Sequence, residues 1–163
     1  MTRTSSGVDA AGLDALTDAV LTASRLLVAI SVRSIAAAGE TLTLPQFRLL
    51  VVLHARGPLK HATLAEHLGV TPSTASRTVD RLVAGGLVDR RTSPVSRREI
   101  ILAITPDGAR IVRRVIARRR KEIAKVVGRM SAGHRDGLVE ALTAFAEAGG
   151  EPALDGAPEA IWG

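Results

Sequence analysis

Residues 59–82 read LKHATLAEHLGVTPSTASRTVDRL and contain two short helical patterns with a turn between them. Gly69 ends the first pattern, because glycine readily takes the positive φ that closes a helix. Thr71 then offers a hydroxyl to the free amides of a second helix, and Pro72 stands where its missing N–H costs nothing. The spacing predicts a first helix that begins near His61 and a second helix that begins at Thr71.

The second of these helices separates apolar residues from polar ones. Its apolar positions, which we expect to be buried, are Ala75, Val79 and Leu82. Two helices joined by a tight glycine turn, with a small polar outer face on the second, are typical of a helix-turn-helix. Small side chains let the backbone approach base edges, and an arginine can bind guanine through two hydrogen bonds. The positions expected to face outward are Ser73, Thr74, Ser76, Arg77 and Asp80.

A β-hairpin is expected directly after this helix, which Gly85-Gly86 ends. Residues 87–91 read as a strand, and residues 92–98 are typical of a turn. Residues 99–104 place apolar residues at every second position on one face of an extended chain, which predicts a second strand. A hairpin that follows a helix-turn-helix indicates a winged helix. The apolar positions of the second strand are Ile100, Leu102 and Ile104.

The N-terminal segment predicts a long helix with apolar residues at alternating steps of three and four, a heptad-like seam. Leu26, Val32 and Ile35 lie off this seam, so the helix has more than one apolar face to bury. A second copy of the chain could cover these faces, and this interpretation is favoured over a central helix in a monomeric bundle. The seam consists of Leu13, Leu16, Val20, Ala23, Leu27 and Ile30.

Three further helices and one short strand complete the predicted elements. Residues 45–55 predict a helix that buries Phe47, Leu50 and Val51, and Leu59 is too isolated for more than a one- or two-residue strand. Thr105-Pro106-Asp107 starts a helix to about Met130. A last helix, capped by Ser131 and closed by Gly149-Gly150, carries the apolar stripe Leu138, Leu142 and Phe145.

The composition restricts the class of protein. Among 163 residues, 46% are apolar but only 2% are aromatic, which suits helices packed closely through Leu, Val, Ile and Ala. The net charge of +6 and the pI of about 11.1 favour an acidic partner, and nucleic acid is the commonest, although basic charge also aids solubility. The cationic run from Arg113 to Lys125 fits a solvated helix face better than a DNA contact. The absence of cysteine excludes disulfides and thiolate metal sites.

Other function classes lack sequence support. No secretory signal is visible, and uncharged apolar segments such as residues 26–32 are shorter than the ~20 residues that span a bilayer. We therefore expect a cytoplasmic protein with no membrane partner. His54, His61, His67 and His134 have no metal-ligand spacing, and no catalytic motif or phosphate loop occurs. We expect no metal, no cofactor and no enzyme activity.

The order of these elements resembles the MarR family of bacterial transcription regulators. The residues that carry the resemblance are LAEHLGVTPSTASRTVDRLVAGGLVDRR (64–91) and SRREIILAITPDG (96–108), and it extends over about residues 10–148. It implies a mainly α homodimer with a small β-wing, whose winged helix-turn-helix lobes bind a pseudo-palindromic operator in double-stranded DNA. It also implies repression that is relieved when a small aromatic or weak-acid effector binds between the lobes and the dimerisation helices.

The wing departs from the family pattern at one position. The family carries Asp-Arg-Arg before the Leu-Thr pair that ends the second strand, whereas this chain has Ser96-Arg97-Arg98 before Ile104-Thr105. Serine accepts only a neutral hydrogen bond, roughly half as strong as one to a carboxylate. We therefore expect a more mobile wing in the free protein.

The predicted organisation has four parts. Residues 1–8 form a flexible N terminus, and residues 9–38 and 106–148 form the dimerisation helices. Residues 45–105 form the DNA-binding lobe, and residues 149–163 form a flexible C-terminal tail.

The candidate DNA-binding residues lie on the second helix of the motif and in the wing. Arg77 is the candidate for a guanine contact, and Arg97 for the minor groove, with Arg98 more structural. Asp80 is expected to pair with Arg77 or Arg81, or to accept from a cytosine amino group, and Arg90 and Arg91 contact phosphates or solvent. The complete candidate set is Ser73, Thr74, Ser76, Arg77, Arg81, Arg97 and Arg98.

Two other functions remain open from the sequence. The chain could be a dimeric sensor or interaction protein whose helix-turn-helix no longer reads DNA, which only the Ser96 departure supports. It could also be a nonspecific architectural DNA binder.

Overall fold

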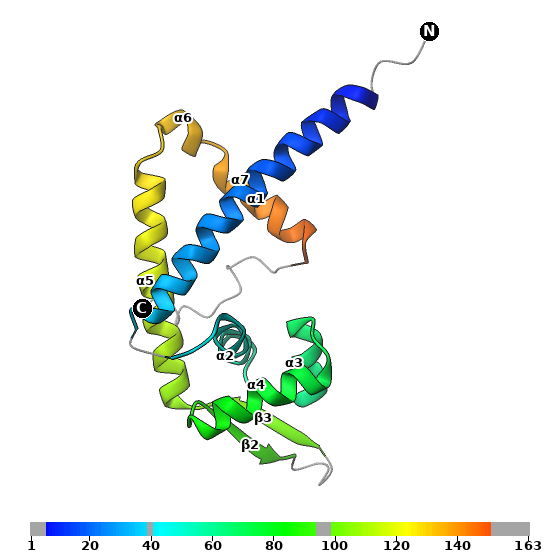
Figure 1. The fold of residues 1–163 in the computed structure, drawn as a ribbon, viewed down its shortest axis with the longest axis vertical. Helices are drawn as coiled ribbons and strands as arrows, with labels where there is room; N and C mark the ends of the chain where they lie inside the picture. Colours follow the sequence, from blue (N-terminus) through cyan, green and yellow to red (C-terminus); the bar gives the residue numbers. More distant parts are fainter. Residues whose placement is uncertain (1–5, 39–40, 94–98, 151–163) are drawn as a thin grey trace.

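The computed structural model describes residues 6–38, 41–93 and 99–150, and it consists of a small lobe with long helical arms (Figure 1). Figure 1 shows α1 running away from the lobe, and α6 and α7 following the far end of α5. In chain order the elements are α1 (Ser6–Ala36), α2 (Leu44–Arg56), β1 (Leu59–Lys60), α3 (His61–Leu68), α4 (Pro72–Ala84), β2 (Val88–Thr92), β3 (Ile100–Ile104), α5 (Pro106–Gly128), α6 (Ala132–Arg135) and α7 (Leu138–Ala148).

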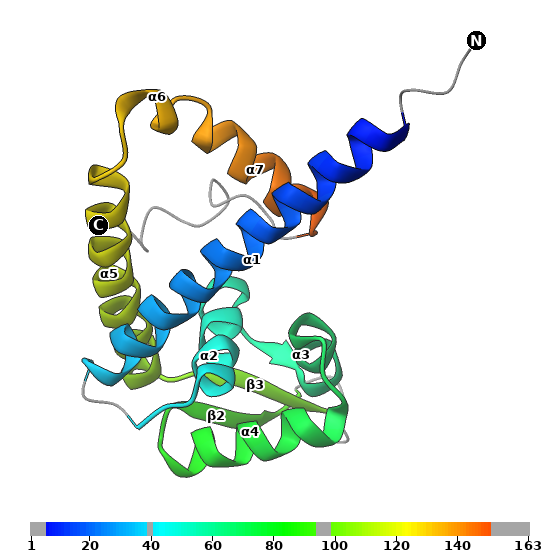
Figure 2. The ribbon, with the colours of Figure 1, turned by 45° about the horizontal axis from the view of Figure 1, so that its top comes forward.

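The lobe is a winged helix built from α2, α3, α4, the sheet and the first turns of α5 (Figure 2). The sheet has the order β1-β3-β2, and both pairs of strands are antiparallel. Leu50, Leu64, Val79, Leu102 and Val112 come from five different elements and have no exposed surface. This shared core holds α4 against the rest of the lobe.

The helix-turn-helix forms as the sequence predicts. α3 begins at His61, and Gly69 ends it in the left-handed region with φ 65°. The Thr71 side chain caps α4 by accepting a hydrogen bond from the Thr74 amide at 3.3 Å. Ala75, Val79 and Leu82 are buried, which confirms the predicted inner face of α4.

The sheet confirms the predicted hairpin and the short strand at Leu59, which is β1. β2 and β3 pair from Val88↔Ile104 to Thr92↔Ile100, and Leu59 of β1 pairs with Leu102. Ile100 is 49% exposed, although it was expected on the buried face, because the core reaches only as far as Leu102. Ser96, Arg97 and Arg98 lie outside the described residues.

Three details of the helices differ from the sequence-based expectation. α1 begins at Ser6, inside the segment expected to be flexible; residues 1–5 and 151–163 lie outside the described residues. α2 buries Leu49 and Leu53 in addition to Phe47 and Leu50, whereas Val51 is only partly buried, because both sides of this helix contact other elements. The predicted last helix is divided into α6 and α7, because Gly137 takes a φ of 76° between them.

The single chain leaves the arms largely uncovered. Within α1, Ile30 and Ile35 are buried, but most of the predicted seam is exposed, including Leu16 at 66%. In the stripe on α7, Leu142 and Phe145 are also exposed, with Phe145 at 59%, whereas Leu138 is partly buried. Within the described residues, positions 10–36 of α1 are long and apolar enough to span a membrane, judged by length and composition alone.

His54 is a half-buried histidine of α2. Its Nε2 atom is buried and has no hydrogen-bond partner within the described residues. Burial lowers the pKa of His54, and the nearby positive charge of Arg113 lowers it further. The neutral imidazole is therefore favoured, which agrees with a packing role for this residue.

The contact between α5 and the wing predicts the effect of one substitution. A Cβ at Gly108 would lie 2.5 Å from the Leu87 carbonyl oxygen and 2.9 Å from Ile104 Cγ1. The Thr105 amide holds this carbonyl by a hydrogen bond of 3.1 Å. We expect Gly108→Ala to lower the free energy of unfolding in urea by about 1–3 kcal/mol.

Gly128→Ala is the matched control, because nothing lies within 4 Å of a Cβ at this end of the same helix. It should leave the free energy of unfolding unchanged or raise it by up to about 1 kcal/mol. Equal stability of the wild-type and Gly108→Ala chains would contradict the close packing at Gly108.

Candidate nucleic-acid interface

The outer face of α4 is polar and accessible. Ser73, Thr74, Arg77 and Arg81 are exposed, in agreement with the expectation for this helix. Arg77 and Arg81 have no hydrogen-bond or ion-pair partner among the described residues, and they stand one helical turn apart on one face. Two guanidinium groups are therefore available to an external acceptor.

The hydroxyls at the start of α4 form a small cluster. Thr71 Oγ1 donates to Thr74 Oγ1 at 3.0 Å and lies 3.1 Å from Ser73 Oγ. Because Thr74 Oγ1 accepts this bond, its own proton remains available to an external acceptor. The cluster belongs to the N-terminal cap of the helix and leaves Ser73 and Thr74 on the surface.

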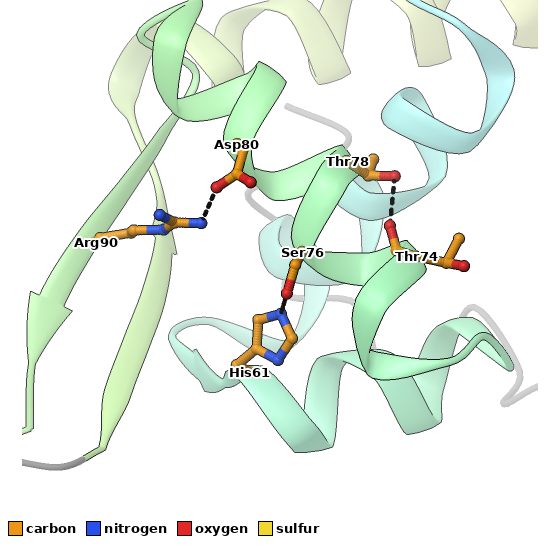
Figure 3. A network of polar contacts seen from close by, with 6 residues as sticks. All are labelled: His61, Thr74, Ser76, Thr78, Asp80 and Arg90. Carbon is orange, nitrogen blue, oxygen red and sulfur yellow. Dashed lines mark hydrogen bonds and ion pairs between the residues drawn. The ribbon is translucent and has the colours of Figure 1, made fainter.

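Ser76 is tied to α3. Its Oγ lies 3.0 Å from Nε2 of His61, and the pair is partly buried (Figure 3). Ser76 was expected to face outward, but α3 lies close enough for His61 to engage its hydroxyl. The bond joins the two helices of the motif, and the sequence reasoning missed His61 because this residue shares no local pattern with Ser76.

Asp80 forms an ion pair with Arg90 of β2, and Figure 3 shows Asp80 pointing towards that strand. The expected pairing of Asp80 with Arg77 or Arg81 is wrong, because the strand brings Arg90 across the flank of α4. Arg91 pairs with Asp89 at 3.3 Å. Both pairs are exposed, so each contributes little stability, of the order of 0–1 kcal/mol. The first pair directs the Arg90 side chain towards α4, and the second keeps Arg91 beside its own strand.

The described residues contain no group of three or more His, Asp or Glu side chains that could hold a metal ion. The cationic run on α5 is partly engaged within the chain. Arg118 donates to the Ala37 carbonyl at 3.3 Å, and Lys125 pairs with Glu122 at 2.6 Å. The Lys125 hydrogen bond lowers the pKa of Glu122. The exposed arginines of α4 therefore remain the strongest candidates for an interface.

Comparison with known proteins identifies related chains. The family profile described as MarR family matches residues 42–100. The crystal structure of RV1404 from Mycobacterium tuberculosis is 53% identical, covers 93% of this chain and 99% of that chain, and has a TM-score of 0.80. The HTH-type transcriptional repressor Rv2887 from the same species is 34% identical over 56% of this chain and 66% of its own length.

A further similar structure is the PcaV transcriptional regulator from Streptomyces coelicolor, solved with its natural ligand. It is 28% identical, covers 68% of this chain and 78% of that chain, and has a TM-score of 0.51. The chain spans between about half and two thirds of the length of the curated relatives that it matches.

The fold and the exposed face of α4 define a winged helix-turn-helix protein. The RV1404 match extends along almost the whole chain, and the family profile covers most of the lobe. The chain belongs to the MarR family of transcriptional regulators.

The Ser76–His61 hydrogen bond predicts that the Ser76 hydroxyl contributes to the stability of the lobe and not to base recognition. We expect Ser76→Ala to lower the free energy of unfolding by about 1 kcal/mol, because it removes a partly buried hydrogen bond. His61→Ala should cost a similar amount, and the double variant should cost little more than either one, which a double-mutant cycle in urea measures.

The DNA sequences selected by Ser76→Ala should match those selected by the wild type. Additive single effects in the cycle, or a changed base preference, would instead make Ser76 a direct base contact.

Proposed function

We propose that this chain is a homodimeric, sequence-specific transcriptional repressor that binds double-stranded DNA. The observation that carries the proposal is the outer face of α4, where Arg77 and Arg81 are exposed and unpaired among the described residues, beside small hydroxyl side chains. Each lobe would place α4 in a major groove, and two-fold symmetry would set half-sites about one helical turn, ~34–36 Å, apart. The similarity to the repressor Rv2887 supports repression.

The wing supplies the second DNA contact in this proposal. β2 and β3 extend past the buried core, as the exposure of Ile100 indicates. In the sequence, Arg97 and Arg98 stand between these two strands. Both lie outside the described residues. We retain Arg97 as the minor-groove contact and Arg98 as its structural neighbour.

The exposed arms support a homodimer. α1 and α7 present large apolar side chains to solvent in the single chain, and exposed apolar patches often mark protein–protein interfaces. The same elements of a second copy would cover these side chains in a symmetric interface that surrounds more than one face of α1. The exposed residues that would be buried are Leu13, Leu16, Leu21, Leu26, Leu27, Val28, Val32, Val139, Leu142 and Phe145.

A protein partner fits α1 better than a membrane does. Asp14, Asp18, Arg25 and Arg33 are distributed along the helix, and charges inside a bilayer are costly. The C-terminal end of α1 also lies beside α5, where Arg118 donates to the Ala37 carbonyl (Figure 1). We therefore propose a cytoplasmic protein with no membrane partner.

A small-molecule effector completes the proposed function. The PcaV regulator was solved with a natural ligand, which supports ligand control in this chain also. We propose a small aromatic or weak-acid effector that releases the DNA when it binds. No cofactor or catalytic activity is part of this function.

Arg77→Ala tests base reading by α4. We expect it to weaken binding to the selected operator by roughly 1–3 kcal/mol and to relax the preference at one base position, because a guanine contact is lost. Fluorescence anisotropy with the operator and with single-base variants measures both effects. An equal loss on every duplex would reduce Arg77 to a phosphate contact.

Leu16→Asp tests the dimer. We expect it to raise the dimer dissociation constant about tenfold or more, or about 1.4 kcal/mol, because each copy would bury an unpaired carboxylate in the interface. Sedimentation equilibrium measures the constant, and Leu16→Met, which keeps an apolar side chain, is the matched control. A wild-type chain that sediments as a folded monomer would contradict the proposed interface.

A further inference from the structure

A hollow of about 240 Å³ lies beside α4, between this helix, α2 and the turn after α3. Thr74 and Thr78 of α4 line it, and Figure 3 shows both on the opposite side of the helix from Asp80 and Arg90. Apolar side chains such as Leu44 form most of its wall. The hollow is therefore a feature of the flank of α4 that faces away from β2.

Arg48 of α2 is the one charged residue among those described that line this hollow. Its side chain is exposed and has no hydrogen-bond or ion-pair partner among the described residues. Thr78 Oγ1 donates to the Thr74 carbonyl at 3.2 Å, so its proton is already used. The Thr74 hydroxyl accepts from Thr71 and keeps its own proton. The hollow thus offers one guanidinium and one hydroxyl donor, and no carboxylate is present among its described lining residues.

The two flanks of α4 differ in charge. On the β2 side, Arg90 and Arg91 are each paired with an aspartate. On the α2 side, Arg48 has no partner within residues 6–38, 41–93 and 99–150. A helix in the major groove has a phosphate strand along each wall of the groove, which is about 12 Å wide. The strand on the α2 side would therefore meet Arg48 without a competing carboxylate from the lining residues.

We propose that Arg48 and Thr74 bind one backbone phosphate of the DNA strand on the α2 side of α4. Arg48 comes from a neighbouring helix and not from α4, so it would lie at the wall of the groove and not at its floor. The apolar wall suits the sugar next to that phosphate. Phosphate contacts position a protein without reading sequence. The inference rests on the proposed DNA binding and names a contact that the sequence analysis missed.

A salt titration of binding tests this assignment. We expect Arg48→Gln to weaken binding by the same factor on the operator and on a scrambled duplex. The slope of log Kobs against log salt should fall in magnitude by about 0.9 per lobe, or about 1.8 for the dimer. The ratio of wild-type to variant affinity should then shrink about 12-fold between about 50 mM and about 200 mM salt.

Arg56→Gln is the matched control. Arg56 is exposed, ends the same helix about 12 Å further along its axis, and does not line the hollow. This variant removes the same charge and should keep the wild-type slope. Both variants should unfold at the wild-type temperature, because neither arginine has a partner among the described residues.

Three results would overturn the phosphate assignment. Arg48→Gln could retain the wild-type slope, or it could change which base is preferred. It could also abolish release by benzoate at an unchanged slope, which would assign the hollow to a small organic acid. By contrast, equal wild-type binding to all duplexes would overturn only the proposed sequence specificity. The phosphate contact could still be tested, because the difference in salt slope can be measured on any duplex.

Discussion

The burial of one face of α4 determines how this protein can meet a partner. Ala75, Val79 and Leu82 are almost completely buried against α2, α3 and the sheet. Rotation of α4 about its axis would expose these side chains and bury charged ones, which costs several kcal/mol. The helix is therefore fixed with Arg77 directed away from the lobe. The outer face of α4 is exposed and accessible to DNA because the inner face is held in the core.

Helix boundaries that depend on residues close together in the sequence could be predicted. Gly69, Thr71 and Thr105 each act on an amide or a φ angle within a few positions, so the starts of α4 and α5 follow from the chain alone. The pairs Ser76–His61 and Asp80–Arg90 could not be predicted, because they depend on how α3 and β2 lie against α4. The position of Arg48 beside Thr74 was missed for the same reason.

The arms show a different limit of sequence reasoning. The apolar seam of α1 predicted that this helix has more than one face to cover, and the single chain leaves most of it exposed. The break at Gly137 was missed, because a glycine between the Ser131 cap and the apolar stripe is compatible with a continuous helix until its φ is known. The proposed homodimer would cover the exposed faces of both α1 and α7. The same interface would set the distance between the two DNA-binding lobes.

The selection of binding sites from a random pool of duplex DNA tests the central claim most directly. A two-fold pair of lobes that each place α4 in a major groove predicts an enriched sequence with two inverted half-sites, their centres about 10–10.5 base pairs or a multiple of this spacing apart. An enriched sequence with a single half-site, or no enrichment over the starting pool, would contradict the account.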